Sequence, residues 1–174
     1  AAFVYAEAHH RGQNRKDGSP FITHPLAVAQ IVAQELHLDS ESIAAALLHD
    51  TIEDTDATHE DIARTFSPTI ADIVEGVSKL TRVQAASKAE EQMENLRKML
   101  LAMSKDIRVI LIKMADRLHN MRTMEYQTPE KQKQKSLETM EIYAPIAHRL
   151  GMQKLKWELE DLSLKYLDPI GYQE

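Results

Sequence analysis

One predicted helix, between Ile107 and Met124, limits the possible folds of this chain more than any other segment. A helix on a protein surface has one polar face. In the predicted helix, however, apolar residues cover most of the circumference. They are Val109, Ile110, Leu111, Ile112, Met114, Leu118 and Met121. Such a helix must be covered by other elements, so we expect it to form the core of a helical domain. The 174 residues are enough for one domain of ordinary size.

The rest of the chain also favours helix. Five Gly and six Pro are too few for a protein built from tight β-turns, and good helix formers are plentiful. Capping residues and prolines predict helix starts at several points. These are Thr23-His24-Pro25, Asp39 or Ser40, Thr58 with Asp61, Ser67-Pro68 and Thr128-Pro129. The sequence therefore predicts an all-α helical bundle with no significant β-sheet.

Helix ends and loops follow from the same signals. We expect helices to end near His10, at Gly151 after a kink at Pro145, and at Tyr166. Residues 12–21 contain two glycines and a proline and predict a loop. Weak periodicity in residues 81–88 predicts a mobile loop, followed by an amphipathic helix over residues 90–103.

Composition excludes several kinds of protein. Cysteine is absent, so disulfides and thiolate metal sites are excluded, and a reducing cytoplasm is the expected location. The longest apolar stretch, Val109 to Ala115, is interrupted by Lys113 and is shorter than the ~20 residues of a membrane span. The net charge of −6 argues against direct nucleic-acid binding.

Acidic residues gather where an apolar run ends. His49 and Asp50 follow this run, and Glu53, Asp54 and Asp56 come next with no Lys or Arg among them. We expect the helix to continue through these acids, so that Glu53 and Asp54 lie one turn beyond His49 and Asp50. Like charges at this spacing repel, and anions at a helix C-terminus oppose the macrodipole. A bound cation would remove both penalties, whereas the alternative is a solvated acidic helix end.

Polar residues also interrupt the apolar helix. Asp116, Asn120 and Thr123 share one of its faces. A buried carboxylate needs a partner, which for Asp116 is either a metal or a salt bridge with a residue such as Arg117 or Arg122. His24, at a loop-to-helix junction, is either a capping or core residue or a ligand. With His49 and Asp50, these residues make a set of two imidazoles and two carboxylates suited to a divalent metal.

Four separated motifs resemble one known family. They are RKDGSPFITHP, HDTIEDT, ADRLHNMRT and YAPIAHRLGMQKLKWELEDLSLKYL, and together they span nearly the whole chain. The order of His and Asp residues is similar to that of the HD superfamily of metal-dependent phosphohydrolases. The motifs more closely resemble the hydrolase domain of the long RelA/SpoT (Rel) alarmone enzymes.

This resemblance implies an activity and a site. The activity is removal of the 3′-pyrophosphate of (p)ppGpp to give GDP or GTP, with manganese (Mn2+) as cofactor, in control of the stringent response. The implied metal ligands are His24, His49, Asp50 and Asp116. The implied catalytic pair that handles the attacking water is Glu53 and Asp54, and the implied substrate contacts are Arg15, Lys16, Asn120 and Thr123.

From the residues alone, without the neighbouring motifs, Arg15 and Lys16 favour an ordinary solvated loop. Further phosphate contacts are open to several basic residues, namely Lys79, Arg82, Lys113 and Arg122. Two alternatives to alarmone hydrolysis also stay open. One is an HD phosphohydrolase for cyclic nucleotides or nucleoside triphosphates, and the other is a non-catalytic alarmone-sensing module.

The resemblance also implies a domain organisation. Residues 1–150 are expected to form the HD-type hydrolase domain, and residues 151–174 a helix and connector that lead toward a synthetase domain. The expected partners are that synthetase domain and the regulatory domains of the same polypeptide, which this sequence lacks. No synthesis of alarmone is expected from this chain.

Overall fold

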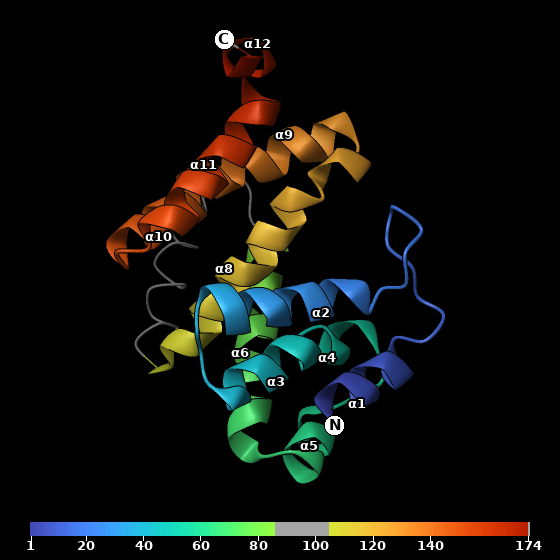
Figure 1. Ribbon diagram of the computed structural model, residues 1–174. Coiled ribbons are helices and arrows are strands. Elements are labelled where there is room, and N and C mark those ends of the chain that lie inside the picture. The colour runs from blue at the N-terminus through green and yellow to red at the C-terminus, as the bar shows by residue number, and fades with distance from the viewer. Residues whose placement is uncertain (86–104, 174) are drawn as a thin grey trace. The chain divides into compact units, whose positions relative to one another are not determined.

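The computed structural model describes residues 1–85 and 105–173, and these residues form helices joined by turns and loops (Figure 1). In these two ranges there is no strand, and an isolated bridge joins Asn14 to Pro20. The all-α prediction is confirmed. The chain divides into two compact units, Ala1–Ala115 and Asp116–Glu174, and the boundary falls inside one continuous helix, α8.

The first unit is a cluster of helices around α3. It contains α1 (Ala2–His9), α2 (Thr23–Gln30) continued by the π-helical turn η1 (Ile31–Glu35), α3 (Ser40–Leu48), α4 (Thr51–Asp54), α5 (His59–Thr65), α6 (Pro68–Ala85) and the start of α8 (Ile107–Arg122). Helix α3 packs against α1, α2 and α6, while α5 packs against α6. Burial of apolar surface between these helices is the main source of stability.

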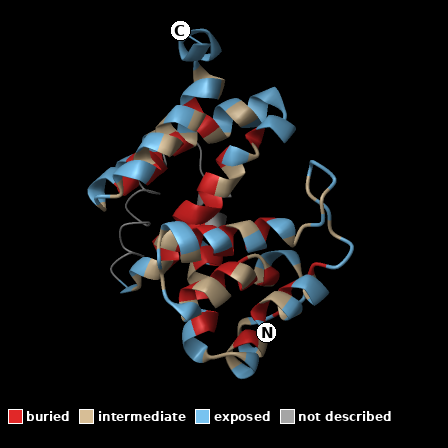
Figure 2. Ribbon diagram, viewed as in Figure 1, coloured by how far each residue is buried: buried red, intermediate tan, exposed pale blue. Residues whose placement is uncertain are grey.

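After its first two residues, α8 is mostly buried, as the red part of its ribbon in Figure 2 shows. Ile110, Ile112 and Met114 have no exposed surface. The prediction of a core helix is therefore confirmed. Gly76 of α6 lies so close to this helix that an added Cβ would stand 2.8 Å from Cγ2 of Val109. The absence of a side chain at Gly76 thus allows the two helices to meet.

Several predicted helix starts are confirmed by their hydrogen bonds. The carboxylate of Asp39 accepts from the backbone N–H of Ser42 at 3.0 Å, and Thr58 forms a reciprocal capping box with Asp61. Helix α2 begins at Thr23, so Pro25 is its third residue and not its first. The first-turn N–H groups have no partner within a helix, so proline is tolerated there as well.

One predicted loop is partly wrong. Helix α6 continues through Ala85 and includes the first five residues of the loop predicted over residues 81–88. Alanine, glutamine and arginine are good helix formers, and this local preference outweighs the weak apolar periodicity on which the loop was inferred. The rest of that loop and the helix predicted over residues 90–103 lie outside the described residues.

The helix that carries the acidic cluster was predicted as continuous, and this is wrong. Helix α3 ends at Leu48, and α4 begins at Thr51 after a turn formed by His49 and Asp50. Glu53 and Asp54 therefore lie in a separate helix of four residues. The macrodipole argument has little force in so short a helix, whereas the mutual repulsion of the carboxylates does not depend on it.

The second unit is also helical. After the last residues of α8 it contains η3 (Met124–Tyr126), α9 (Pro129–Glu138), the π-helical turn η4 (Thr139–Tyr143), α10 (Ala144–Arg149), α11 (Gln153–Leu167) and α12 (Pro169–Gln173). Helix α11 packs against α9, η4 and α10. The capping start at Thr128-Pro129 is confirmed, since the hydroxyl of Thr128 accepts from the backbone of Lys131.

The predicted irregularity at Pro145 appears as the π-helical turn η4, which ends two residues before it. Proline lacks an N–H and cannot continue the regular ladder, so a wider turn at this point is physically reasonable. Gly151 follows α10 with a φ of 73°, a left-handed conformation typical of glycine after a helix. No helix in the described ranges is long and apolar enough to cross a bilayer.

Candidate metal centre

The turn between α3 and α4 brings His49 and Asp50 to a buried position beside His24. Nε2 of His49 lies 3.0 Å from Oδ2 of Asp50, and Nε2 of His24 lies 3.9 Å from the same oxygen. Both imidazoles are almost fully buried, and the Asp50 side chain is 17% exposed. Three of the predicted metal ligands therefore meet within the first unit.

A backbone contact determines which nitrogen of His49 carries the proton. Nδ1 of His49 lies 2.6 Å from the carbonyl oxygen of Ala46, which can only accept a hydrogen bond, so Nδ1 is the donor. In the neutral ring, Nε2 then presents a lone pair toward the carboxylate of Asp50. A lone pair and an anionic oxygen repel unless a proton or a cation lies between them. This arrangement suits a ligand nitrogen that is oriented by its backbone hydrogen bond.

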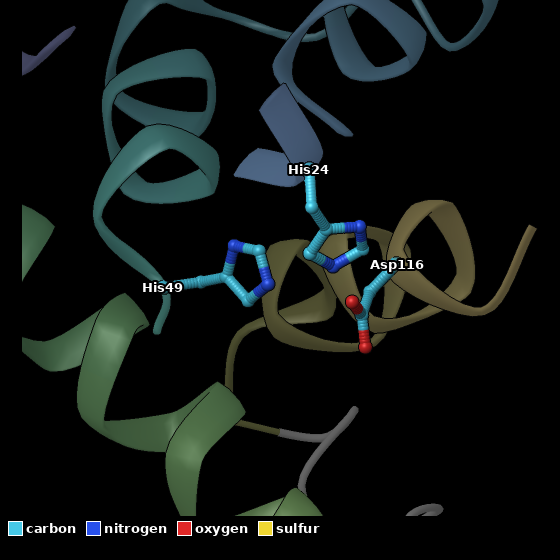
Figure 3. Close-up of side chains that lie close together, drawn as sticks. All are labelled: His24, His49 and Asp116. Carbon is cyan, nitrogen blue, oxygen red and sulfur yellow. The ribbon is translucent and has the colours of Figure 1, made fainter. Parts of the chain in front are cut away.

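The carboxylate of Asp116 completes a candidate group with the two histidines (Figure 3). Asp116 follows Ala115 directly in helix α8 and is 8% exposed. One ligand atom from each of His24, His49 and Asp116 lies within 4.8 Å of the others. Ligands that share one ion at ~2.1 Å stand at most ~4.2 Å apart, so small side-chain adjustments suffice.

The chemistry of this donor set fits a divalent transition metal. Imidazole nitrogens and carboxylate oxygens bind such ions, whereas a calcium site would be built from oxygen ligands. The residues therefore fit a metal ion, although their geometry does not select one metal.

Arg117 and Arg122, the alternative partners considered for Asp116, pair with other acids of the second unit. The guanidinium of Arg117 is buried, lies 3.1 Å from Glu138 and stands over the ring of Tyr143. The guanidinium of Arg122 lies 2.7 Å from Glu158.

Glu53 and Asp54 lie on α4, directly after the turn of His49 and Asp50. Partial burial of its carboxyl group raises the pKa of Glu53, while a hydrogen bond from Ser78 lowers it and the charge of Asp50 raises it. Burial also raises the pKa of Asp54, and Asp50 adds to this effect. Carboxyl groups with raised pKa values are stronger bases than ordinary surface carboxylates.

Two residues that act on Glu53 were not assigned this role from the sequence. The hydroxyl of Ser78, on α6, donates to Oε1 of Glu53 at 3.1 Å. Lys113, on α8, is 5% exposed, and its charge lowers the pKa of Glu53. From the sequence, Lys113 is predicted only as a possible phosphate contact. No local pattern reveals either contact, because tertiary packing brings these helices together.

The predicted basic pair, Arg15 and Lys16, lies in an ordered loop of the first unit. The backbone N–H of Arg15 donates to the carbonyl of Ser19 at 2.8 Å, and Asn14 bridges to Pro20. Lys16 lies exposed near the tip of this loop. The loop prediction for residues 12–21 is confirmed, and its hydrogen bonds show that it has a defined conformation.

The remaining predicted substrate contacts, Asn120 and Thr123, belong to the second unit. Asn120 is in α8, and the Thr123 hydroxyl donates to the carbonyl of His119 at 3.1 Å. Among the other basic residues, Lys79 lies 3.9 Å from Glu75 on the same helix. The side chain of Arg82 is outside the described part of the chain. The assignment of these residues to substrate stays a prediction.

Comparison with known proteins agrees with the geometry. The family model described as HD domain matches residues 2–153. The chain is 54% identical over 164 residues to a guanosine-3′,5′-bis(diphosphate) 3′-pyrophosphohydrolase of Haemophilus influenzae. The matched region covers 94% of this chain and 24% of that protein. It is 52% identical over 172 residues to the bifunctional (p)ppGpp synthase/hydrolase SpoT of Escherichia coli, covering 99% of this chain and 24% of that protein.

A solved structure is similar as well. It is described as a metazoan ortholog of SpoT that hydrolyzes ppGpp, with a TM-score of 0.64 and 29% identity. The match covers 99% of this chain and 92% of the solved one. By contrast, the chain spans only about a quarter of the length of the two bacterial relatives. The family match covers most of the sequence and includes the histidines and carboxylates of the candidate metal centre, and the chain belongs to the HD domain family.

Proposed function

We propose that this chain hydrolyses the 3′-pyrophosphate of (p)ppGpp, giving GDP or GTP and pyrophosphate, with Mn2+ as cofactor in the cytoplasm. One observation carries the proposal: a buried group of His24, His49 and Asp116 lies next to an acidic pair whose pKa values are raised. The similarity to proteins named as ppGpp pyrophosphohydrolases supports the choice of substrate.

In this proposal, His24, His49, Asp50 and Asp116 hold the ion. Bound there, it would lower the pKa of water and polarise a phosphoryl oxygen. The backbone hydrogen bond of His49 keeps the proton on Nδ1 and directs Nε2 inward. Orientation by this contact limits the freedom that the ligand would lose on binding.

The reaction itself needs a base. Glu53 or Asp54 accepts a proton from the attacking water, whose oxygen bonds to the phosphorus attached to the ribose 3′ oxygen. The bond between that phosphorus and the 3′ oxygen breaks, and the 3′ oxygen takes up a proton in place of the one removed from water. GDP or GTP is thus the leaving group, and the oxygen of water remains in pyrophosphate. The raised pKa values of both carboxyl groups make them better proton acceptors than ordinary surface carboxylates.

Positive charge is needed to bind a polyanion. Arg15 can stack on a base or bind phosphate in a bidentate manner, and Lys16 adds a compact charge. Asn120 and Thr123 are the proposed contacts to the nucleoside. Control of the stringent response by this activity is part of the same proposal, as is cooperation with the synthetase and regulatory domains of a longer polypeptide.

The test compares substrates and acid variants. With Mn2+, turnover of ppGpp should far exceed turnover of cyclic nucleotides or nucleoside triphosphates. Glu53→Gln and Asp54→Asn should each lower kcat by at least ~100-fold, in line with the loss of general base catalysis, while Mn2+ binding measured by calorimetry is retained. Asp56→Asn is the matched control, since this exposed acid lies in the same cluster outside the proposed pair.

Other outcomes select the alternatives. Preferential turnover of another nucleotide would replace the proposed substrate within the same enzyme class. Binding of ppGpp without cleavage by the wild-type chain would contradict the proposal and favour a sensing module.

A further inference from the structure

A chain of two side-chain hydrogen bonds links the end of α1 to the acidic pair of α4. Nδ1 of His10 lies 2.9 Å from Oε1 of Gln13, and Nε2 of Gln13 donates to the backbone carbonyl of Asp54 at 2.8 Å. His10 and Asp54 are far apart in sequence, and all three residues belong to the first unit. The link therefore depends on tertiary structure.

The direction of each hydrogen bond follows from its acceptor. The carbonyl oxygen of Asp54 can only accept, so the amide nitrogen of Gln13 must face it. The amide oxygen of Gln13 then faces His10, and this oxygen can also only accept. His10 must therefore carry its proton on Nδ1. The amide of Gln13 is oriented from both sides.

Each end of this link lies at a part of the proposed site. Asp54 is the last residue of α4, where a helical carbonyl lacks a partner within its own helix, and Gln13 supplies one. Gln13 is also the base of the loop that carries Arg15, because its carbonyl accepts from the N–H of Phe21 at 2.9 Å. Gln13 thus links α4, which carries Glu53 and Asp54, to the loop that carries Arg15.

His10 is well fixed. It is 2% exposed, its backbone N–H donates to Ala6, and its ring lies 4.7 Å from the ring of Phe21. A buried ring cannot easily rotate, so it presents the same nitrogen to Gln13 at all times. This rigidity distinguishes the Gln13 amide from that of a free surface glutamine.

We propose that Gln13, oriented by His10, is a positioning residue. It fixes the position of α4, which carries Glu53 and Asp54, relative to the loop that carries Arg15. It acts through the backbone of Asp54 and touches neither substrate nor metal. This inference rests on the proposed hydrolysis of (p)ppGpp. Small errors in the position of a catalytic group cause large losses of rate, so the contact should influence kcat.

The first test replaces Gln13. In Gln13→Met both hydrogen bonds are lost at similar side-chain length, and kcat for ppGpp should fall about tenfold, as expected for one hydrogen bond of ~1.4 kcal/mol. Gln13→Glu keeps the acceptor for His10 but cannot donate to Asp54, so its kcat should fall at least as far. The Mn2+ affinity of both variants should stay within about twofold of wild type.

The matched control is Gln132→Met in the second unit. The Gln132 amide also donates to backbone carbonyls, those of Met124 and Gln127, at 3.2 and 3.1 Å. Its replacement should leave kcat unchanged. Equal kcat values in Gln13→Met, Gln132→Met and wild type would overturn the positioning role, whereas inactive wild-type protein would instead overturn the proposed function.

The second test separates orientation from mere packing. The side-chain amide of His10→Asn can donate in place of Nδ1, so kcat should stay within about threefold of wild type, while His10→Leu should resemble Gln13→Met. Equal losses in both His10 variants would contradict the role. Nitrogen-15 NMR of the metal-free protein gives a readout independent of activity: His10 should be protonated on Nδ1, and protonation on Nε2 alone would also contradict it.

Discussion

The hydroxyl of Ser78, on α6, donates a hydrogen bond of 3.1 Å to Oε1 of Glu53, on α4. This contact opposes the burial that raises the pKa of Glu53. It joins a proposed catalytic carboxyl group to a buried residue of another helix, since Ser78 is only 1% exposed. Burial and this hydrogen bond thus act in opposite directions on the pKa of Glu53.

Replacement of Ser78 by alanine should move the pH dependence of hydrolysis. Loss of the hydrogen bond removes a contact that favours the carboxylate, so the pKa of Glu53 should rise further. Because the deprotonated form accepts the proton of water, the acidic limb of kcat/KM should shift to higher pH. The profile measured between pH 5 and 9 checks this.

A matched control is Ser163→Ala, which removes another buried hydroxyl. Ser163 donates to the carbonyl of Leu159 at 2.6 Å within α11. Its replacement should leave the acidic limb in place. An unchanged limb in Ser78→Ala would show that this hydrogen bond does not tune Glu53.

Removal of the two charges on α4 should stabilise the metal-free protein at neutral pH. The folded pKa values of Glu53 and Asp54 are raised, so their contribution to stability is full below the ordinary pKa values and is lost as the pH rises through the folded ones. The double variant Glu53→Gln/Asp54→Asn should therefore gain about 0.5 to 1 kcal/mol of unfolding free energy at pH 7, because these groups are partly solvated and screened. Urea unfolding at pH 4 and pH 7 measures the difference, which should be smaller at pH 4.

Asp39→Asn should lower the unfolding free energy at pH 7, opposite to the gain expected for Glu53→Gln/Asp54→Asn. Hydrogen bonds from Ser42 lower the pKa of Asp39, so its stabilising effect is present above the ordinary pKa and is lost as the pH falls through the lowered value. Its replacement should lower stability at pH 7 by a few tenths of a kcal/mol, because asparagine also caps helices. If the unfolding free energy at pH 7 changed in the same direction in both variants, the stated directions of these pKa shifts would be contradicted.

Binding of Mn2+ should stabilise the wild-type chain and should depend on Asp50. An ion at ~100 times its dissociation constant adds about 2.7 kcal/mol to the unfolding free energy, and a chelator should reverse this gain. In Asp50→Asn most of the gain should disappear, whereas Asp56→Asn should retain it. Thermal unfolding with and without Mn2+ provides the comparison, and an equal gain in Asp50→Asn would exclude this carboxylate as a ligand.

Gly76→Ala should destabilise the first unit through Val109. The added methyl group would stand 2.8 Å from Cγ2 of Val109, and overpacking of this kind costs about 1 to 3 kcal/mol. Val109→Ala also destabilises by leaving a cavity, but in the double variant the new methyl group partly fills that space. The double variant should therefore be more stable than the sum of the single changes predicts. If chemical unfolding showed that the two losses of unfolding free energy simply add, direct contact between positions 76 and 109 would be contradicted.

The sequence by itself determined the helical class and most helix starts. Capping by Asp39 and Thr58 and the proline start at Pro129 are local signals, because each involves residues within one turn. The apolar circumference of α8 likewise determined that this helix is buried. The adjacency of His49 and Asp50 is covalent, so their convergence near one point needed no knowledge of packing.

Only the tertiary structure decided how the acidic cluster is divided and what surrounds it. The break after Leu48 places Glu53 and Asp54 on a separate short helix, against the expectation of one continuous helix. Ser78 reaches Glu53 across 25 residues of sequence, and Gln13 reaches Asp54 across 41. Such contacts leave no periodic signal, because side chains at these separations meet only when helices pack. The pKa values of the acidic pair depend on the same packing, since burial and neighbouring charges set them.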